Sequence, residues 1–158
     1  MNSKKDGVEL EDANGVRLVR LSSYSDSRGN LRAGEFPKEL PFEPKRIFLV
    51  SDVPSESVRG QHAHLECEQF LIAVRGSVRV RTTSMGKVSE HWLKDPSVGL
   101  FLPRLVWGEQ DRYSADCVLL VLASQEYDSN DYLRDFKEFL GAEKRLRSGR
   151  SLTNMNKN

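Results

Sequence analysis

The residues with the clearest chemical potential are His62 and His64, in the segment VRGQHAHLECEQ that spans residues 58–69. On a β-strand, alternate residues point to the same face, and the Cα atoms of these two positions would lie about 6.5–7 Å apart. Two imidazole rings at that spacing can bind a metal ion, act as an acid–base pair, or form a polar strand face without chemistry. All three interpretations are open from the pair alone.

A metal site in a β-barrel would need ligands beyond the two histidines. Glu68 follows them at a suitable distance, but the later strand LFLPRLVWGEQ has Gly108 where a third histidine is expected. The remaining histidine of the chain lies elsewhere, in the segment VSEHWL. Two histidines and one carboxylate can bind a divalent ion, but the site would lack the third histidine expected on the later strand. We therefore expect no metal at this site.

The acid–base interpretation fits the neighbouring residues better. An unperturbed imidazole titrates near pH 6.5, so it can take up and return a proton at neutral pH. Arg59 stands next to the Gly60 turn and would supply a fixed positive charge for an anion or a developing oxyanion. Together, His62, His64 and Arg59 are the predicted catalytic residues of a proton-transfer isomerase.

Composition excludes several other classes of function. The 158 residues suit one compact domain, and 24 basic against 23 acidic residues give a formal net charge of +1. This balance predicts no nucleic-acid or anionic-membrane partner. No apolar run approaches the roughly 20 residues that span a bilayer, and the N-terminus lacks a signal-type apolar core. With Cys67 and Cys117 read as reduced thiols, we expect a cytoplasmic protein.

The elements that must position the histidines are strands. Short apolar runs alternate with turn residues throughout residues 16–124, and SVRVRT alternates strictly, with Val78 and Val80 on one face and Arg79 and Arg81 on the other. CVLLVLAS is a continuous apolar run, typical of a strand covered on both faces. The pattern predicts an all-β fold, an antiparallel sandwich or small barrel.

One C-terminal helix is expected, capped by Ser129 or Asn130 and ended by Gly141. Its apolar stripe would contain Leu133, Phe136, Phe139 and Leu140. We therefore predict a disordered N-terminal segment at 1–14, one domain at 15–141, and a polar, basic, disordered tail at 142–158.

Several blocks of the sequence resemble the dTDP-sugar 3,4-ketoisomerase family, the WxcM-like cupins. The resemblance covers about residues 16–140. It rests on PFEPKRIFLVSDVPSESVRGQHAHLECEQFLIAVRGSVRV, then LKDPSVGLFLPRLVWGEQ, then DCVLLVLASQEYDSNDYLRDFKEFL, which occur in the family's order.

This resemblance implies a cupin jelly-roll antiparallel β-barrel that needs no metal or other cofactor, usually as a homodimer with strands exchanged between subunits. The substrate implied is a dTDP-4-keto-6-deoxyhexose, whose keto group moves from C4 to C3 through an enediol during deoxysugar biosynthesis. His62 and His64 match the proton-transferring histidines of the family, with Arg59 as the nearby cation.

Four further residues are predicted to bind substrate, each with a structural alternative. Trp107 would stack on a base or sugar, or form core. Gln69 and Glu109 would hydrogen-bond sugar hydroxyls, or satisfy buried backbone groups. Arg46 would contact phosphate, or form a surface ion pair.

The chain departs from the family pattern around the expected pocket. Phe48 and Leu49 stand where family members carry a pocket tyrosine, Leu65 replaces a lysine, and Gly108 replaces a histidine. These departures leave open a changed substrate or isomer, a 3-epimerase or 3,5-epimerase, and a non-catalytic nucleotide-sugar-binding protein. No sequence feature brings Tyr113, Tyr127 or Tyr132 to the site.

Overall fold

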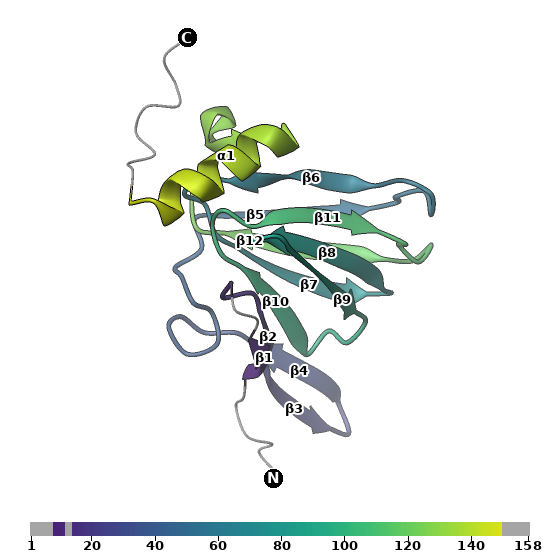
Figure 1. Cartoon of the computed structure of the whole chain (residues 1–158). Helices are drawn as coiled ribbons and strands as arrows, with labels where there is room; N and C mark the ends of the chain where they lie inside the picture. Colours follow the sequence, from purple (N-terminus) through teal and green to yellow (C-terminus); the bar gives the residue numbers. More distant parts are fainter. Residues whose placement is uncertain (1–7, 12–13, 150–158) are drawn as a thin grey trace.

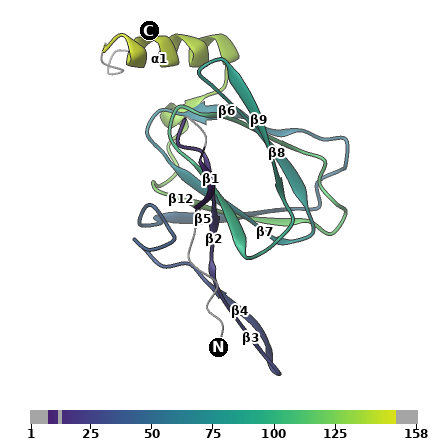
Figure 2. The ribbon, with the colours of Figure 1, turned by 60° about the horizontal axis from the view of Figure 1, so that its bottom comes forward.

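The computed structural model describes residues 8–11 and 14–149, and these form two antiparallel sheets packed face to face (Figures 1 and 2). The larger sheet has the strand order β1-β2-β10-β7-β12-β5, and the smaller has the order β13-β6-β11-β8-β9. The predicted antiparallel, mostly β jelly-roll class is confirmed. Within the described residues the two sheets stay separate, so the arrangement is a sandwich and not a closed barrel.

The bounds of the elements are as follows. The larger sheet contains β1 (Val8–Glu11), β2 (Arg17–Arg20), β5 (Arg46–Ser51), β7 (Gln69–Arg75), β10 (Val98–Leu102) and β12 (Val118–Ala123). The smaller sheet contains β6 (Arg59–His64), β8 (Val78–Ser84), β9 (Lys87–Leu93), β11 (Trp107–Asp111) and β13 (Tyr132–Leu133). A separate hairpin is formed by β3 (Ser22–Asp26) and β4 (Gly29–Ala33), and the helical elements are η1 (Ser129–Asp131) and α1 (Phe136–Arg147).

The alternation seen in the sequence sets which side chains form the core. Val78 and Val80 of β8 are fully buried between the sheets, whereas Arg79 and Arg81 lie on the outer face. The core between the sheets consists of Val16, Leu71, Ala73, Val78, Val80, Leu93, Leu100, Leu102, Val106, Tyr113, Cys117, Leu119 and Val121. The histidine pair stands at one end of this core.

The strand β12 is apolar on both faces, as CVLLVLAS predicts. Leu119 and Val121 point into the core between the sheets. Leu120 and Leu122 point outward and pack against a second cluster that includes Leu40 of the loop after β4. Cys117, just before this strand, and Cys67 are both buried and unpaired, as predicted.

The C-terminal helix differs from its prediction at both ends. It begins after Asp135, whose carboxylate accepts hydrogen bonds from the backbone N–H groups of residues 137 and 138. Residues 129–131 form only a single 3₁₀ turn, and Leu133 lies in β13. The helix continues through Gly141 because Glu143 is buried and accepts hydrogen bonds from the Ser84 hydroxyl (2.9 Å) and the backbone N–H of Met85 (2.7 Å).

Parts of the two segments predicted to be disordered form regular secondary structure. Residues 8–11 form β1, which pairs with β2, and residues 142–147 belong to α1. The rest of these predictions, for residues 1–7, 12–13 and 150–158, lies outside the described residues. None of the helices in the described part is long and apolar enough to cross a bilayer.

Candidate active site

A β-bulge in β6 positions the residues that precede the histidines. The pairing with β11 places His62 opposite Gly108 and Arg59 opposite Gln110, so β6 has one extra residue between these pairs. Gly60 lies in the bulge with φ of +77°, and a Cβ there would lie 2.7 Å from the carbonyl oxygen of Gly108. Only glycine fits this position without strain. Because directly opposite residues share a face, the bulge turns Arg59 to the same side as His62.

The structure brings the two predicted histidines together. Their ring centroids lie 5.0 Å apart and the rings meet edge to face at 88°. Both line a cavity at the end of the core, whose other lining residues are Gln69, Leu102, Pro103, Val106, Gly108 and Gln110. The cavity measures about 10 Å³, room for about one water molecule. A hexose ring therefore reaches the histidines only if lining side chains shift.

His64 is held at both ring nitrogens. Its Nδ1 lies 2.8 Å from Oδ2 of Asp131, and its Nε2 lies 3.2 Å from the amide nitrogen of Gln69. All three side chains are buried. Gln69, predicted to bind substrate, thus contacts a histidine ring.

Asp131 is the anchor of this arrangement. Its Oδ1 accepts a hydrogen bond from the backbone N–H of Glu66 (2.7 Å), and its Oδ2 accepts one from the backbone N–H of Cys67 (3.3 Å). Burial alone would raise the pKa of this carboxyl. The hydrogen bonds from His64 and the two N–H groups outweigh burial and lower the pKa below its ordinary value. Asp131 is therefore ionised at neutral pH.

His62 has a different environment. Its Nδ1 is buried and has no hydrogen-bond partner of good geometry among the described residues. Burial lowers the pKa of His62 to about 4, the positive charges of Arg134 and of a His64 ring protonated at acid pH act in the same direction, and the backbone of Gly60 opposes them. At neutral pH the ring is uncharged and has a nitrogen free to take a proton.

Arg59 lies at the exposed mouth of the site. It faces the same side as Gln110, whose amide oxygen accepts a hydrogen bond from the Tyr113 hydroxyl (3.3 Å). Burial raises the pKa of Tyr113, and the positive charge of Arg59 opposes that rise. The predicted cation thus flanks the pocket.

Arg46 and Phe48 project from β5 into the space between the sheets, whereas Leu49 points outward. The guanidinium of Arg46 lies over the rings of Phe48 (5.3 Å) and Tyr127 (5.5 Å). The Nε atom of Arg46 is buried and has no hydrogen-bond partner among the described residues. Of the two positions where the resemblance leads us to expect a tyrosine, Phe48 is therefore the one that faces inward.

Trp107 and Glu109 lie outside the histidine pocket. They occupy the outer face of β11, because Gly108 and Gln110 take the inner one. Trp107 packs against Phe139 of α1 (5.6 Å between ring centroids), under the helix that covers this part of the smaller sheet (Figure 1). Glu109 pairs with Arg81 (2.8 Å). Trp107 thus has its structural alternative, core packing, whereas Glu109 forms an ion pair that neither of its predicted roles included.

Sequence reasoning missed two residues at the site, Asp131 and Tyr132. The pairing of β13 with β6 places Tyr132 opposite His64, and its ring lies 4.9 Å from that of His62 and 4.4 Å from that of His64. The guanidinium of Arg134 lies over the Tyr132 ring, 4.3 Å from its centroid. The segment SNDYLRD has two aspartates and one tyrosine, and this local pattern did not indicate that it enters the site.

One group of potential metal ligands occurs among the described residues. Ligand atoms of His64, Cys67 and Asp131 lie within 4.8 Å of one another. The His64 and Asp131 atoms already bond to each other, and the Cys67 thiol donates to the backbone carbonyl of Glu68 (3.4 Å). A metal ion would have to displace these hydrogen bonds.

We expect the His62 ring to titrate near pH 4, below the ordinary imidazole pKa of about 6.5. Between these pH values the unfolded chain binds this proton and the folded chain does not. The neutral ring thus contributes full stability above about pH 6.5, and that contribution is lost as pH falls toward 4.

Proton NMR of the ring signals, assigned with His62→Gln, measures the midpoint. Urea unfolding should show a shallower loss of stability in His62→Gln over this window, and a midpoint at or above pH 6.5 would contradict the assigned environment.

Comparison with known proteins identifies the family of the chain. Residues 14–144 match the model of the FdtA family, described as WxcM-like, C-terminal. Over 123 residues the chain is 40% identical to a TDP-4-oxo-6-deoxy-alpha-D-glucose-3,4-oxoisomerase of Aneurinibacillus thermoaerophilus, which covers 78% of this chain and 88% of that protein.

Solved structures with the same fold include two 3,4-ketoisomerases. QdtA of Thermoanaerobacterium thermosaccharolyticum, in complex with TDP, is 36% identical with a TM-score of 0.81, covering 85% of this chain and 97% of that one. A 3,4-ketoisomerase of Helicobacter canadensis is 38% identical with a TM-score of 0.79, covering 82% and 97%. A dTDP-4-dehydrorhamnose 3,5-epimerase of Bacillus anthracis shares the fold alone, at 12% identity and a TM-score of 0.72. The chain therefore belongs to the FdtA family of WxcM-like proteins.

Proposed function

We propose that this protein moves the keto group of a dTDP-4-keto-6-deoxyhexose from C4 to C3, with His62 as the group that carries the proton at carbon. The isomerase class, of the sugar 3,4-ketoisomerase type, follows from the family. The observation that supports the assignment to His62 is its buried, unpaired Nδ1 in a ring that lines the cavity.

The reaction moves one proton from C3 to C4 and a second proton from the C3 oxygen to the C4 oxygen. Neutral His62 takes the proton from C3, and the C3–H electron pair forms a C3=C4 double bond while the C4 carbonyl becomes an oxyanion. A proton then passes from the C3 hydroxyl to the C4 oxygen. The C3=O bond forms as C4 takes the proton back from the imidazolium of His62.

The environment of His62 suits both halves of this cycle. Its pKa of about 4 keeps it available as a base throughout the neutral range. The same burial makes its imidazolium form short-lived, so the ring returns the proton readily to C4. The dry surroundings also strengthen the attraction between the oxyanion and nearby cations.

Two arginines suit the charges of the substrate. Arg59, turned toward the pocket by the bulge, is placed to stabilise the enediolate. Arg46 faces the space between the sheets with an unpaired Nε, which suits contact with the diphosphate. Both roles depend on the substrate entering from the open end of the sandwich.

In deuterated buffer, the wild-type protein should incorporate deuterium into the keto sugar nucleotide and produce the 3-keto isomer. His62→Asn should lower the rate by at least about 10²-fold, because general acid–base catalysis contributes that much or more. Proton NMR follows both the label and the product. A 4-keto product inverted at C3 would instead identify an epimerase.

The matched control is His91→Asn, which makes the same change on β9, where the ring contacts Thr82 outside the cavity. This variant should keep wild-type exchange. Binding of the sugar nucleotide by the wild-type protein without formation of any 3-keto product would contradict the proposed isomerase.

We also propose that two copies of the chain pair through the outer face of the larger sheet. Ile47 and Leu49 of β5 are 66% and 63% exposed there, and Val74 of β7 is 41% exposed. An apolar surface of this kind on a sheet normally marks an interface. Because the chain resembles a family that usually forms dimers, we expect the partner to be a second copy of the chain.

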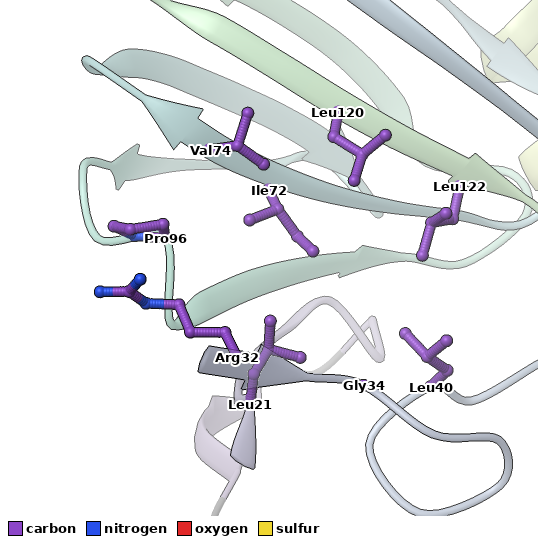
Figure 3. A pocket seen from close by; sticks show the side chains of 9 residues that line it. All are labelled: Leu21, Arg32, Gly34, Leu40, Ile72, Val74, Pro96, Leu120 and Leu122. Carbon is purple, nitrogen blue, oxygen red and sulfur yellow. The ribbon is translucent and has the colours of Figure 1, made fainter. Parts of the chain in front are cut away.

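The projecting hairpin of β3 and β4 extends this face (Figure 2). Figure 3 shows a pocket beneath it, where Ile72 and Leu120 project toward Leu21 and Arg32 across a space of about 370 Å³. This larger pocket lies away from the histidines and has a mostly apolar lining. It suits an apolar side chain of a second copy better than a charged sugar nucleotide.

Light scattering after size-exclusion chromatography should give a dimer for the wild-type protein. Leu49→Glu should shift it to monomer, because a buried, unpaired carboxylate in the interface is costly. Val88→Glu is the control, since Val88 is equally exposed (62%) but lies on β9 of the other sheet. A monomeric wild-type protein, or equal dissociation by both variants, would contradict this interface.

We also propose that the protein acts in the cytoplasm. The two buried, unpaired cysteines support the cytoplasmic location that the sequence predicts.

A further inference from the structure

We infer that Asp131 and Gln69 are positioning residues that hold His64 as a neutral ring with its proton on Nδ1, so that His62 is the only proton carrier of the pair. The catalytic consequence rests on the proposed isomerase function. The protonation state of His64 does not, and it is measurable in the free protein.

The contact at Nδ1 fixes the first proton. An ionised carboxylate only accepts hydrogen bonds, and Oδ2 of Asp131 lies 2.8 Å from this nitrogen. The lowered pKa of Asp131 keeps it ionised through the neutral range. Nδ1 of His64 must therefore carry a hydrogen.

The contact at Nε2 excludes a second proton. The atom 3.2 Å away is the amide nitrogen of Gln69, which only donates. A hydrogen on Nε2 of His64 would point at another donor, with both groups buried and unable to turn to water. The ring is therefore neutral and its second nitrogen is occupied.

Only a carboxylate fits the position of Asp131. Three N–H groups converge on its two oxygens, from the His64 ring and from the backbone of Glu66 and Cys67. An amide in its place would direct its NH₂ group at one of these donors. The segment that carries Asp131 is held beside β6 by the pairing of β13.

The neutral state of His64 matters for its neighbour. With the two ring centroids only 5.0 Å apart, a charge on His64 would oppose the positive charge that His62 acquires during turnover. Asp131 and Gln69 thus keep the pair from holding two protons at once. His64 keeps its own protonation state while a proton moves between the substrate and His62.

The direct test is nitrogen-15 NMR of histidine-labelled protein, which has only three histidines to assign. His64 should show one protonated Nδ1 and one unprotonated Nε2 between pH 6 and 8. A doubly protonated ring, or a proton on Nε2 with Gln69 turned to accept it, would overturn the inference whatever the enzyme activity.

Two variants test the positioning roles. Asp131→Asn should move the proton of His64 to Nε2 and lower kcat by roughly 10²- to 10⁴-fold, as wrong-tautomer variants of a buried Asp–His pair do. Gln69→Glu should protonate His64 fully at neutral pH and lose activity. That activity should recover as pH falls, because a protonated Glu carboxyl donates to Nε2 as the amide does.

The control is Asp128→Asn, the same substitution three residues earlier, where Asp128 caps η1 and asparagine caps equally well. It should leave both the NMR signals and the activity unchanged. A Gln69→Glu variant with a pH-independent loss would indicate a merely structural role and overturn the proposed one. Failure of the wild-type protein to isomerise any keto sugar nucleotide, with the His64 tautomer as expected, would refute only the proposed function.

Discussion

The hydrogen bond between Asp131 and His64 is the interaction on which the site depends. It joins two parts of the chain 67 residues apart and closes the end of the smaller sheet, where β13 pairs with β6. Because Asp131 also accepts two backbone N–H groups, it fixes the turn that follows β6 together with the ring. With one histidine fixed in this way, we propose that the other acts as the acid and base. The asymmetry of two apparently equivalent rings thus arises from their partners and not from their spacing.

The bulge in β6 is the second constraint. Regular alternation would place Arg59 and His62 on opposite faces, since they are three residues apart. The extra residue beside Gly60 reverses that and brings a cation to the side of the histidines. The close approach of Gly60 to the backbone of Gly108 explains why a glycine precedes the two histidines. The same pairing sets Gly108 opposite His62.

Much of the fold could be predicted from the sequence because it is written in local patterns. The strict alternation of β8 and the apolar run of β12 correctly predicted which of their side chains are buried. The spacing of His62 and His64 correctly predicted that their rings lie close together. The features that could not be predicted depend on long-range contacts. Trp107 and Glu109 lie outside the histidine pocket because β11 turns its other face to the core. The helix α1 continues past Gly141 because the buried Glu143 binds the β8–β9 turn. Asp131 and Tyr132 enter the site through a two-residue strand that no local pattern signals.

The most direct test of His62 as the sole carrier is a single-turnover reaction with substrate deuterated at C3, run in ordinary water. A single, mostly buried base that removes and returns the proton should deliver part of the label to C4 of the 3-keto product, as read by mass spectrometry and NMR. Product that forms with the C3 label lost and with only solvent protium at C4 in every turnover would contradict a single shielded carrier.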